Sequence, residues 1–125
     1  MSKRKRHNFR ELTVWKKARQ NNPRIYLLTK KFPDDEKFGM KSQIKRASVS
    51  IMSNIAEGAG RRTNKDFVNF LGMAHGSATE VENLLIVGLD LGFITKEKFT
   101  IQKEYLHEIQ KMMNGLMDSL EKSDI

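Results

Sequence analysis

The stretch from Ser42 to Arg62 constrains the fold more than any other part of the chain. At 100° per residue, its apolar side chains and the preceding methionine fall on two faces of a helix instead of one stripe. The first face is formed by Met40, Ile44, Ala47, Ile51 and Ile55. The second is formed by Val49, Met52 and Ala56, with Lys41 and Lys45 on the same side. An apolar arc this wide needs two packing partners. We expect one to be the core of the domain, and the second to be another flank of that core or another subunit.

Three further segments carry apolar residues at helical spacing between helix start and stop signals. We predict helices over residues 9–31, 40–59, 64–91 and from Thr95 or Thr100 to about residue 120, with a single turn starting at Asp34. Pro23 removes a backbone donor inside the first helix, which predicts a kink or break near residues 19–22. No stretch alternates with period two. The sequence therefore predicts an all-α, antiparallel up-down-up-down four-helix bundle over residues 8–122.

The turn and glycine residues have distinct expected roles. Thr63, followed three residues later by Asp66, is typical of a helix N-terminus. Gly58 and Gly60 are placed to cap the end of the second helix. Gly72, Gly76 and Ser77 keep one face of the third helix narrow, and each glycine costs about 1 kcal/mol of helix propensity. We expect that narrow face to allow close packing of another helix.

Several of these segments also carry a family resemblance. QIKRASVSI, SNIAEGAGRR and FVNFLGMAHGSATEVE resemble a family of small bacterial four-helix-bundle proteins encoded in intervening sequences of 23S ribosomal RNA genes (S23-like). That family is related to the accessory protein of the reverse transcriptase in diversity-generating retroelements. The resemblance covers residues 9–120 and implies a homopentameric ring. The chain departs from the family at Asn21 and Asn22, where apolar residues are usual.

The composition favours a single cytoplasmic domain with an acidic partner. The chain has 125 residues, no cysteine and a net charge of +8. A disulfide or a thiolate metal site is thus excluded. Its N-terminus lacks the apolar region of a signal peptide, and its longest apolar run is too short to cross a bilayer. Residues 1–65 hold 18 lysines and arginines against 5 carboxylates, whereas residues 66–125 hold 5 against 10. This asymmetry favours nucleic acid as the partner, with head-to-tail self-assembly or a solvated charged face as the alternatives.

The candidate nucleic-acid contacts are the basic clusters of the first half. Residues 1–7 are expected to form a disordered basic arm, because nothing in them can be buried. The predicted contact residues are Lys3, Arg4, Lys5, Arg6, Lys41, Lys45, Arg46, Arg61, Arg62 and Lys65. Clustered cations without a base-reading module favour contact with the phosphate backbone of RNA or DNA. The predicted subunit contacts are Val49, Met52 and Ala56.

Catalysis and cofactor binding are not expected. Glu104 and His107 form a single Glu-x-x-His motif, whereas a di-iron bundle needs two such motifs and further glutamates. Asn69–His75 and Lys103–His107 have the spacing of a helical ribonuclease motif but lack its arginine. Gly58-Ala-Gly60 follows a helix instead of a strand, so it is not a phosphate loop. Asn54 and Glu57 are expected to tie the end of the second helix to Arg61, Arg62 or the start of the third.

Three functions remain open at this stage. The first is a non-enzymatic platform that assembles with itself and binds RNA or DNA, as an accessory to a reverse transcriptase or a structured RNA. The second is a protein-binding adaptor that makes no nucleic-acid contact. The third, least favoured, is a bundle-type ribonuclease. None of them requires a metal, a cofactor, a membrane or a small-molecule substrate.

Overall fold

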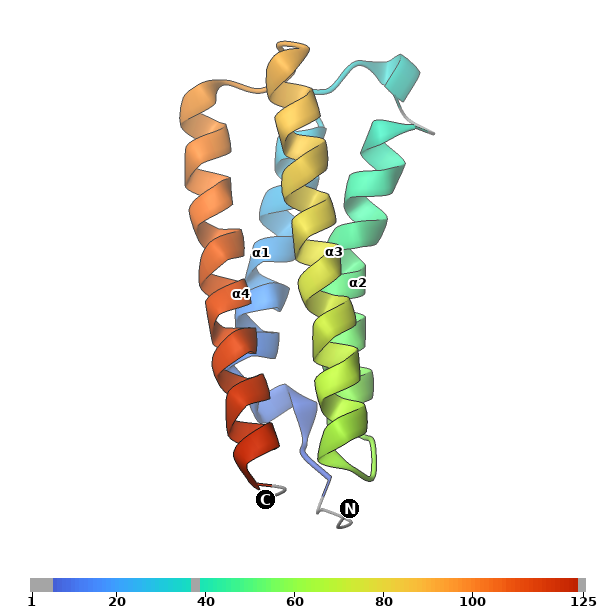
Figure 1. Cartoon of the computed structure of the whole chain (residues 1–125). Coiled ribbons are helices and arrows are strands. Elements are labelled where there is room, and N and C mark those ends of the chain that lie inside the picture. The colour runs from blue at the N-terminus through green and yellow to red at the C-terminus, as the bar shows by residue number, and fades with distance from the viewer. Residues whose placement is uncertain (1–5, 37–38, 124–125) are drawn as a thin grey trace.

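Four long helices lie side by side in the computed structural model, which describes residues 6–36 and 39–123. They are α1 (Thr13–Thr29), α2 (Met40–Ala59), α3 (Asn64–Asp90) and α4 (Lys96–Ser123), with two single-turn helices η1 (Phe9–Glu11) and η2 (Asp34–Glu36). The α1–α2 and α3–α4 connectors lie at one end, while the α2–α3 turn and both termini lie at the other (Figure 1). The described residues contain no strand. Lys3, Arg4 and Lys5 of the predicted arm lie outside the described residues.

Capping residues explain where the helices begin and end. The Thr63 hydroxyl accepts a hydrogen bond from the Asp66 backbone N–H at 3.1 Å, as predicted from the sequence. The Thr95 hydroxyl does the same for Lys98 at 3.2 Å, which selects Thr95 over Thr100 as the start of α4. At the end of α3, Gly92 has a φ of 78°, and the N–H of Phe93 donates to the carbonyl of Gly88 at 2.8 Å. This is the Schellman arrangement, which requires a residue with positive φ.

The first predicted helix differs from the structure in two ways. Residues 9–11 form η1, and Leu12 is extended (φ −72°, ψ 124°), so α1 starts only at Thr13. The predicted break near residues 19–22 is wrong, because α1 runs without interruption through Pro23. Pro23 is exposed on the outer side of the helix, and its neighbours Ile25 and Asn21 are buried. Packing of these neighbours offsets the missing backbone hydrogen bond.

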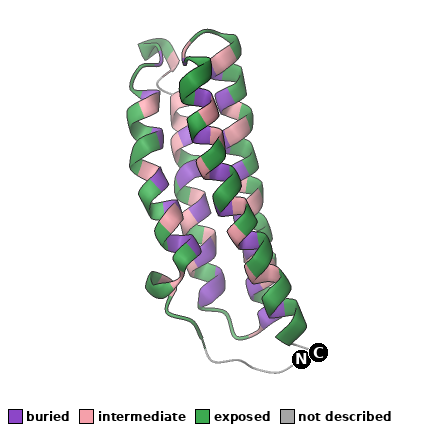
Figure 2. Ribbon diagram, turned by 90° about the vertical axis from the view of Figure 1, so that its left-hand side faces the viewer, coloured by how far each residue is buried: buried purple, intermediate pink, exposed green. Residues whose placement is uncertain are grey.

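The core is a continuous apolar interior to which all four helices contribute (Figure 2). α2 faces it with Ile44, Ile51 and Ile55, and α3 with a stripe of residues that includes the fully buried Phe67 and Leu71. Phe70 of α3 and Leu116 of α4 are half-buried at the edge of this core. The residues on the second apolar face of α2 differ in burial. Met52 and Ala56 pack partly against the core of their own chain, whereas Val49 is exposed.

Of the two glycines predicted to cap the second helix, only one does so. Gly58 is buried within α2, and a Cβ there would lie 2.8 Å from both Cδ1 of Phe67 and Cβ of Phe70. Gly58 is therefore what allows α2 and α3 to approach closely, and Gly60 alone is the C-cap. By contrast, a Cβ at Gly72 or Gly76 would meet no atom within 4 Å. No described helix of the same chain therefore packs closely against these two glycines.

We predict that Gly58→Ala destabilises the protein. The added methyl cannot be accommodated without moving Phe70 at its Cβ, and overpacking of this kind costs about 1–3 kcal/mol, more than the helix propensity gained. Gly115→Ala in α4 is the control, because a Cβ there meets nothing within 4 Å and should stabilise by roughly 0.5–1 kcal/mol. Urea denaturation followed by circular dichroism measures both. Equal effects of the two substitutions would contradict this account of Gly58.

Candidate nucleic-acid interface

One group of predicted basic residues gathers at the end of the bundle that holds the α2–α3 turn. The backbone N–H of His7 donates to the carbonyl of Ala59 at 3.1 Å, and its ring lies edge-on to Phe67 at 5.5 Å. These contacts fix His7, which was predicted to belong to a disordered arm. They also bring Arg6 to the end that carries Arg61 and Arg62. Among the predicted contacts, Arg6, Arg61, Arg62 and Lys65 thus share this end of the molecule.

Arg61 is held more tightly than its neighbours. Its Nη2 lies 3.1 Å from Oε1 of Glu57, and its guanidinium carbon lies 4.5 Å from the centroid of the Phe70 ring. The predicted tie between Glu57 and Arg61 is confirmed. Asn54 was predicted to tie the same helix end, but its amide donates to the carbonyl and hydroxyl of Ser50 within α2, each at 3.0 Å.

The second group lies further up α2. From Arg46 to Gly60 the helix rises about 20 Å, at 1.5 Å per residue, so the two groups are separate patches. Lys41 is largely covered, with 13% of its side chain exposed, and lies 3.6 Å from a carboxylate oxygen of Asp34. The Lys45 ammonium lies 5.1 Å from the centroid of the Tyr26 ring, and Arg46 is exposed. Lys45 and Arg46 therefore remain available for a ligand, whereas Lys41 is largely covered and pairs with Asp34 of η2.

Two shallow hollows run along the outer side of α2. The first has a volume of about 500 Å³ and is lined by Tyr26, Lys45, Arg46, Val49 and hydroxyl or amide side chains of α2. The second, of about 650 Å³, lies between α2 and α3 and shares Ser50 and Asn54 with the first. The Ser50 and Ser77 hydroxyls are hydrogen-bonded at 2.9 Å across this groove.

The contact residues predicted from the sequence do not include the basic face of α1. This helix contains Lys16, Lys17, Arg19 and Arg24 and no aspartate or glutamate. Arg19 lies over Trp15 (5.5 Å to the centroid) and Arg24 over Tyr105 (3.9 Å). A cation held over an aromatic ring keeps its N–H groups available at the edge of the contact. A complete lack of carboxylates over 17 residues was a signal that could have identified this face.

A further pair of cations meets at the opposite end of the bundle. The side chain of Lys31, through a hydrogen bond and then its like charge, lowers the pKa of the Lys98 ammonium below its ordinary value. Lys31 follows α1 and Lys98 lies in the first turn of α4. No local sequence pattern joins them, so only the packing of α1 beside α4 places them together.

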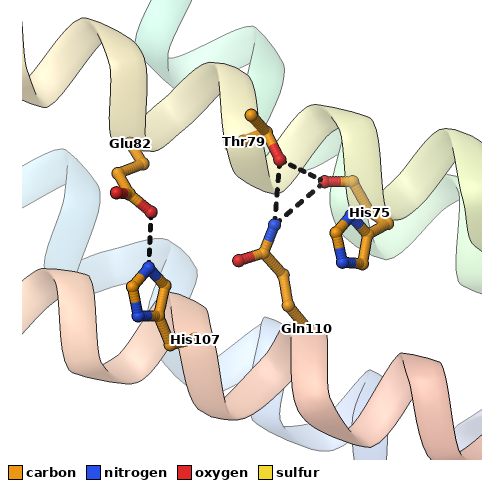
Figure 3. A network of polar contacts seen from close by, with 5 residues as sticks. All are labelled: His75, Thr79, Glu82, His107 and Gln110. Atoms are coloured by element: carbon orange, nitrogen blue, oxygen red, sulfur yellow. Dashed lines mark hydrogen bonds and ion pairs between the residues drawn. The ribbon is translucent and has the colours of Figure 1, made fainter.

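His75 and His107 take part in contacts between α3 and α4 (Figure 3). Nε2 of His107 lies 2.6 Å from Oε1 of Glu82, and Glu104 is not part of the contact. The amide of Gln110 donates to the Thr79 hydroxyl at 3.0 Å and to the backbone carbonyl of His75 at 3.3 Å. In the part of the chain that the structure describes, no three His, Cys, Asp or Glu side chains converge as metal ligands.

The fold and these surfaces define a small all-α bundle with a basic exterior on α1, α2 and the α2–α3 turn. A family model described as "23S rRNA-intervening sequence protein" matches residues 10–115. The chain therefore belongs to the 23S rRNA intervening sequence protein family. It is also similar to a solved Bacteroides thetaiotaomicron VPI-5482 protein of unknown function from the S23 ribosomal protein family. The two share 30% identity and a TM-score of 0.77 over 84% of this chain and 98% of that one.

A comparison with curated proteins finds no match. Among the described residues, no helix combines the length and the apolar character needed to cross a membrane.

The repulsion between Lys31 and Lys98 gives a pH prediction. The native state releases the Lys98 proton at a lower pH than the unfolded chain does, so the unfolded state binds more protons in the window below 10.5. The contribution of Lys98 to the free energy of unfolding is therefore lowest near neutral pH and rises towards pH 10.5. Lys98→Gln should remove this rise, and it should raise the unfolding midpoint at low salt but not at high salt. Lys111→Gln, at another exposed lysine of α4, is the control and should keep the rise.

Proposed function

We propose that the protein is a non-enzymatic platform that assembles with copies of itself and binds the phosphate backbone of RNA or DNA in the cytoplasm. Each subunit is an antiparallel, up-down-up-down bundle whose basic exterior faces the nucleic acid. The family relationship makes a structured RNA a reasonable partner, and a reverse transcriptase bound beside that RNA is a further proposed partner.

The observation that supports this proposal best is the number of unpaired cations on α1, α2 and the adjoining turn. Of the cations described in residues 6–65, Lys17, Lys41 and Arg61 form ion pairs. The remaining cations of this half pair with no described carboxylate: Arg6, Arg10, Lys16, Arg19, Arg24, Lys30, Lys31, Lys45, Arg46, Arg62 and Lys65. Like charges within each of these basic patches repel one another, and a polyanion relieves that repulsion while releasing its own counterions.

Assembly is supported by the outer faces of α2 and α3. Val49 on α2 and Met73 on α3 are exposed large apolar side chains at 40% and 56%. Gly72 and Gly76 leave the adjacent surface of α3 open, so the backbone of a neighbouring subunit could approach closely. A pentameric ring would repeat the basic face around its axis. Where one nucleic-acid strand contacts several subunits at once, the repeated weak contacts together bind it more tightly than one contact does.

A platform of this kind needs no catalytic group. The His107 imidazole contacts Glu82, and the Thr79 hydroxyl donates to the backbone carbonyl of His75, so within residues 6–36 and 39–123 neither imidazole is hydrogen-bonded to a hydroxyl that it could activate. Cleavage of RNA that is lost on His75→Ala or His107→Ala would favour the ribonuclease alternative instead.

The nucleic-acid interface is tested by reversing charges at positions that carry no ion pair. We expect the triple variant Arg46→Glu, Arg62→Glu and Lys65→Glu to lose most affinity for structured RNA or duplex DNA. Each phosphate contact removed should lower the slope of log affinity against log salt by about 0.9 on duplex DNA, or about 0.7 on single strands. Fluorescence polarisation over a range of salt concentrations measures both quantities.

The matched control is a triple variant with the same net charge, in which the three substituted lysines lie elsewhere in the chain. Lys96→Glu, Lys98→Glu and Lys111→Glu also remove three cations, but all from α4. This control should bind nearly as well as the unmodified protein, with unchanged helicity in both triple variants. If the unmodified protein binds neither nucleic acid at low salt, the basic surface serves an acidic protein partner and the adaptor function takes its place.

Assembly is tested at Val49, where a charge does not disturb the core of the subunit. Val49→Glu should give a smaller species by light scattering and the same helical circular dichroism spectrum. Ile101→Glu is the control, because Ile101 on α4 is also an exposed large apolar residue (49%) and lies outside the proposed contact. An unmodified protein that is monomeric at all accessible concentrations would rule out the ring.

A further inference from the structure

A small cavity between α1 and α4 lies outside the surfaces predicted from the sequence. Its volume is about 70 Å³, room for about two water molecules at roughly 30 Å³ each. α1 contributes Lys17, Asn21 and Arg24, which follow one another at helical spacing, and α4 contributes Tyr105 and Glu108. It is therefore a narrow polar opening in an otherwise apolar helix contact, large enough for a compact group of a few atoms.

An unsatisfied donor lies at the wall of this cavity. Asn21 is 2% exposed, and its Oδ1 accepts a hydrogen bond from Nε2 of Gln102 at 2.6 Å. Its Nδ2 makes no hydrogen bond with any residue that the structure describes. A buried amide N–H without an acceptor is costly. Asn21 lines the cavity, but its Nδ2 is covered by protein atoms, so the amide has to turn for this donor to reach an oxygen acceptor bound there.

Arg24 supplies the charge of the site. Its guanidinium carbon lies 3.9 Å from the centroid of the Tyr105 ring, and it pairs with no described carboxylate. Stacking holds the plane of the guanidinium, so its N–H groups are presented in a fixed direction. Lys17 and Glu108 neutralise each other at 3.5 Å. The lining consequently has a net charge of +1 from Arg24 and favours an anion.

We propose that this cavity binds one phosphate group of the nucleic acid. The inference rests on the proposed function and assigns one contact within it. A phosphate is compact, carries a negative charge and offers several acceptor oxygens, so Arg24 and the Nδ2 of Asn21 can donate to it together. A neutral ligand would leave the charge of Arg24 unmatched.

The test compares two arginines of α1. Arg24→Gln removes the cation of the cavity, whereas Arg19→Gln removes an exposed cation that also lies over an aromatic ring but outside the cavity. Thermal unfolding is measured in inorganic phosphate and in chloride of equal ionic strength. Phosphate should raise the midpoint of the unmodified protein and of Arg19→Gln, and this shift should be lost in Arg24→Gln. In the unmodified protein, the side-chain amide resonances of Asn21 should move on titration with phosphate. Equal shifts in both variants would overturn the inference, because phosphate would then act only as a general salt.

A second measurement separates this inference from the proposed function. In RNA titrations Arg24→Gln should weaken binding several-fold more than Arg19→Gln, with both variants equally helical. If RNA binds but the two variants lose affinity equally, the cavity does not bind phosphate of the nucleic acid and the inference fails. If neither RNA nor DNA binds, yet the phosphate shift disappears in Arg24→Gln alone, the anion site stands and the proposed function fails.

Discussion

The close approach of α2 and α3 is the contact on which the rest of the bundle depends. Both helices bury their large apolar side chains in it, and the absence of a side chain at Gly58 lets Phe67 and Phe70 fit against the backbone of α2. Burial of such side chains is the main favourable term in folding. Once α2 and α3 are in register, α1 packs against the other flank of the apolar arc of α2 and leaves Val49 exposed. The position of α1 then decides which cations surround the aromatic rings of α1 and α4.

The sequence predicted the fold well because its signals are local. Helix periodicity and the Thr63 cap depend on neighbours along the chain, so the bounds of α2 and the start of α3 were predicted correctly. The errors concern features that only tertiary contacts decide. Pro23 stays within α1 because flanking residues are buried, and Gly58 is a packing residue although its position near a helix end resembles a cap. The resemblance added the family, which the comparison confirms, but no description of activity.

The candidate sites were harder to predict for a similar reason. Charge counts identified the basic half of the chain, yet they could not show that Lys41 is covered by its contact with Asp34. Nor could they show that Asn21, Arg24 and Tyr105 line one cavity, since Tyr105 lies far away in sequence. Pairings between α1 and α4 join residues about 80 positions apart, as Asn21 and Gln102 illustrate. Single-sequence patterns extend over one or two helical turns and carry no information about such pairs.

Both termini and the α2–α3 turn lie at one end of the bundle, and the remaining connectors lie at the other (Figure 1). The two ends of the subunit therefore differ in connectivity, and the bundle has a direction. Copies that share one orientation would place all their chain ends on the same side. A fluorescent label or affinity tag fused to either terminus would then mark a single side of the assembly and leave the end with Lys31 and Lys98 unobstructed.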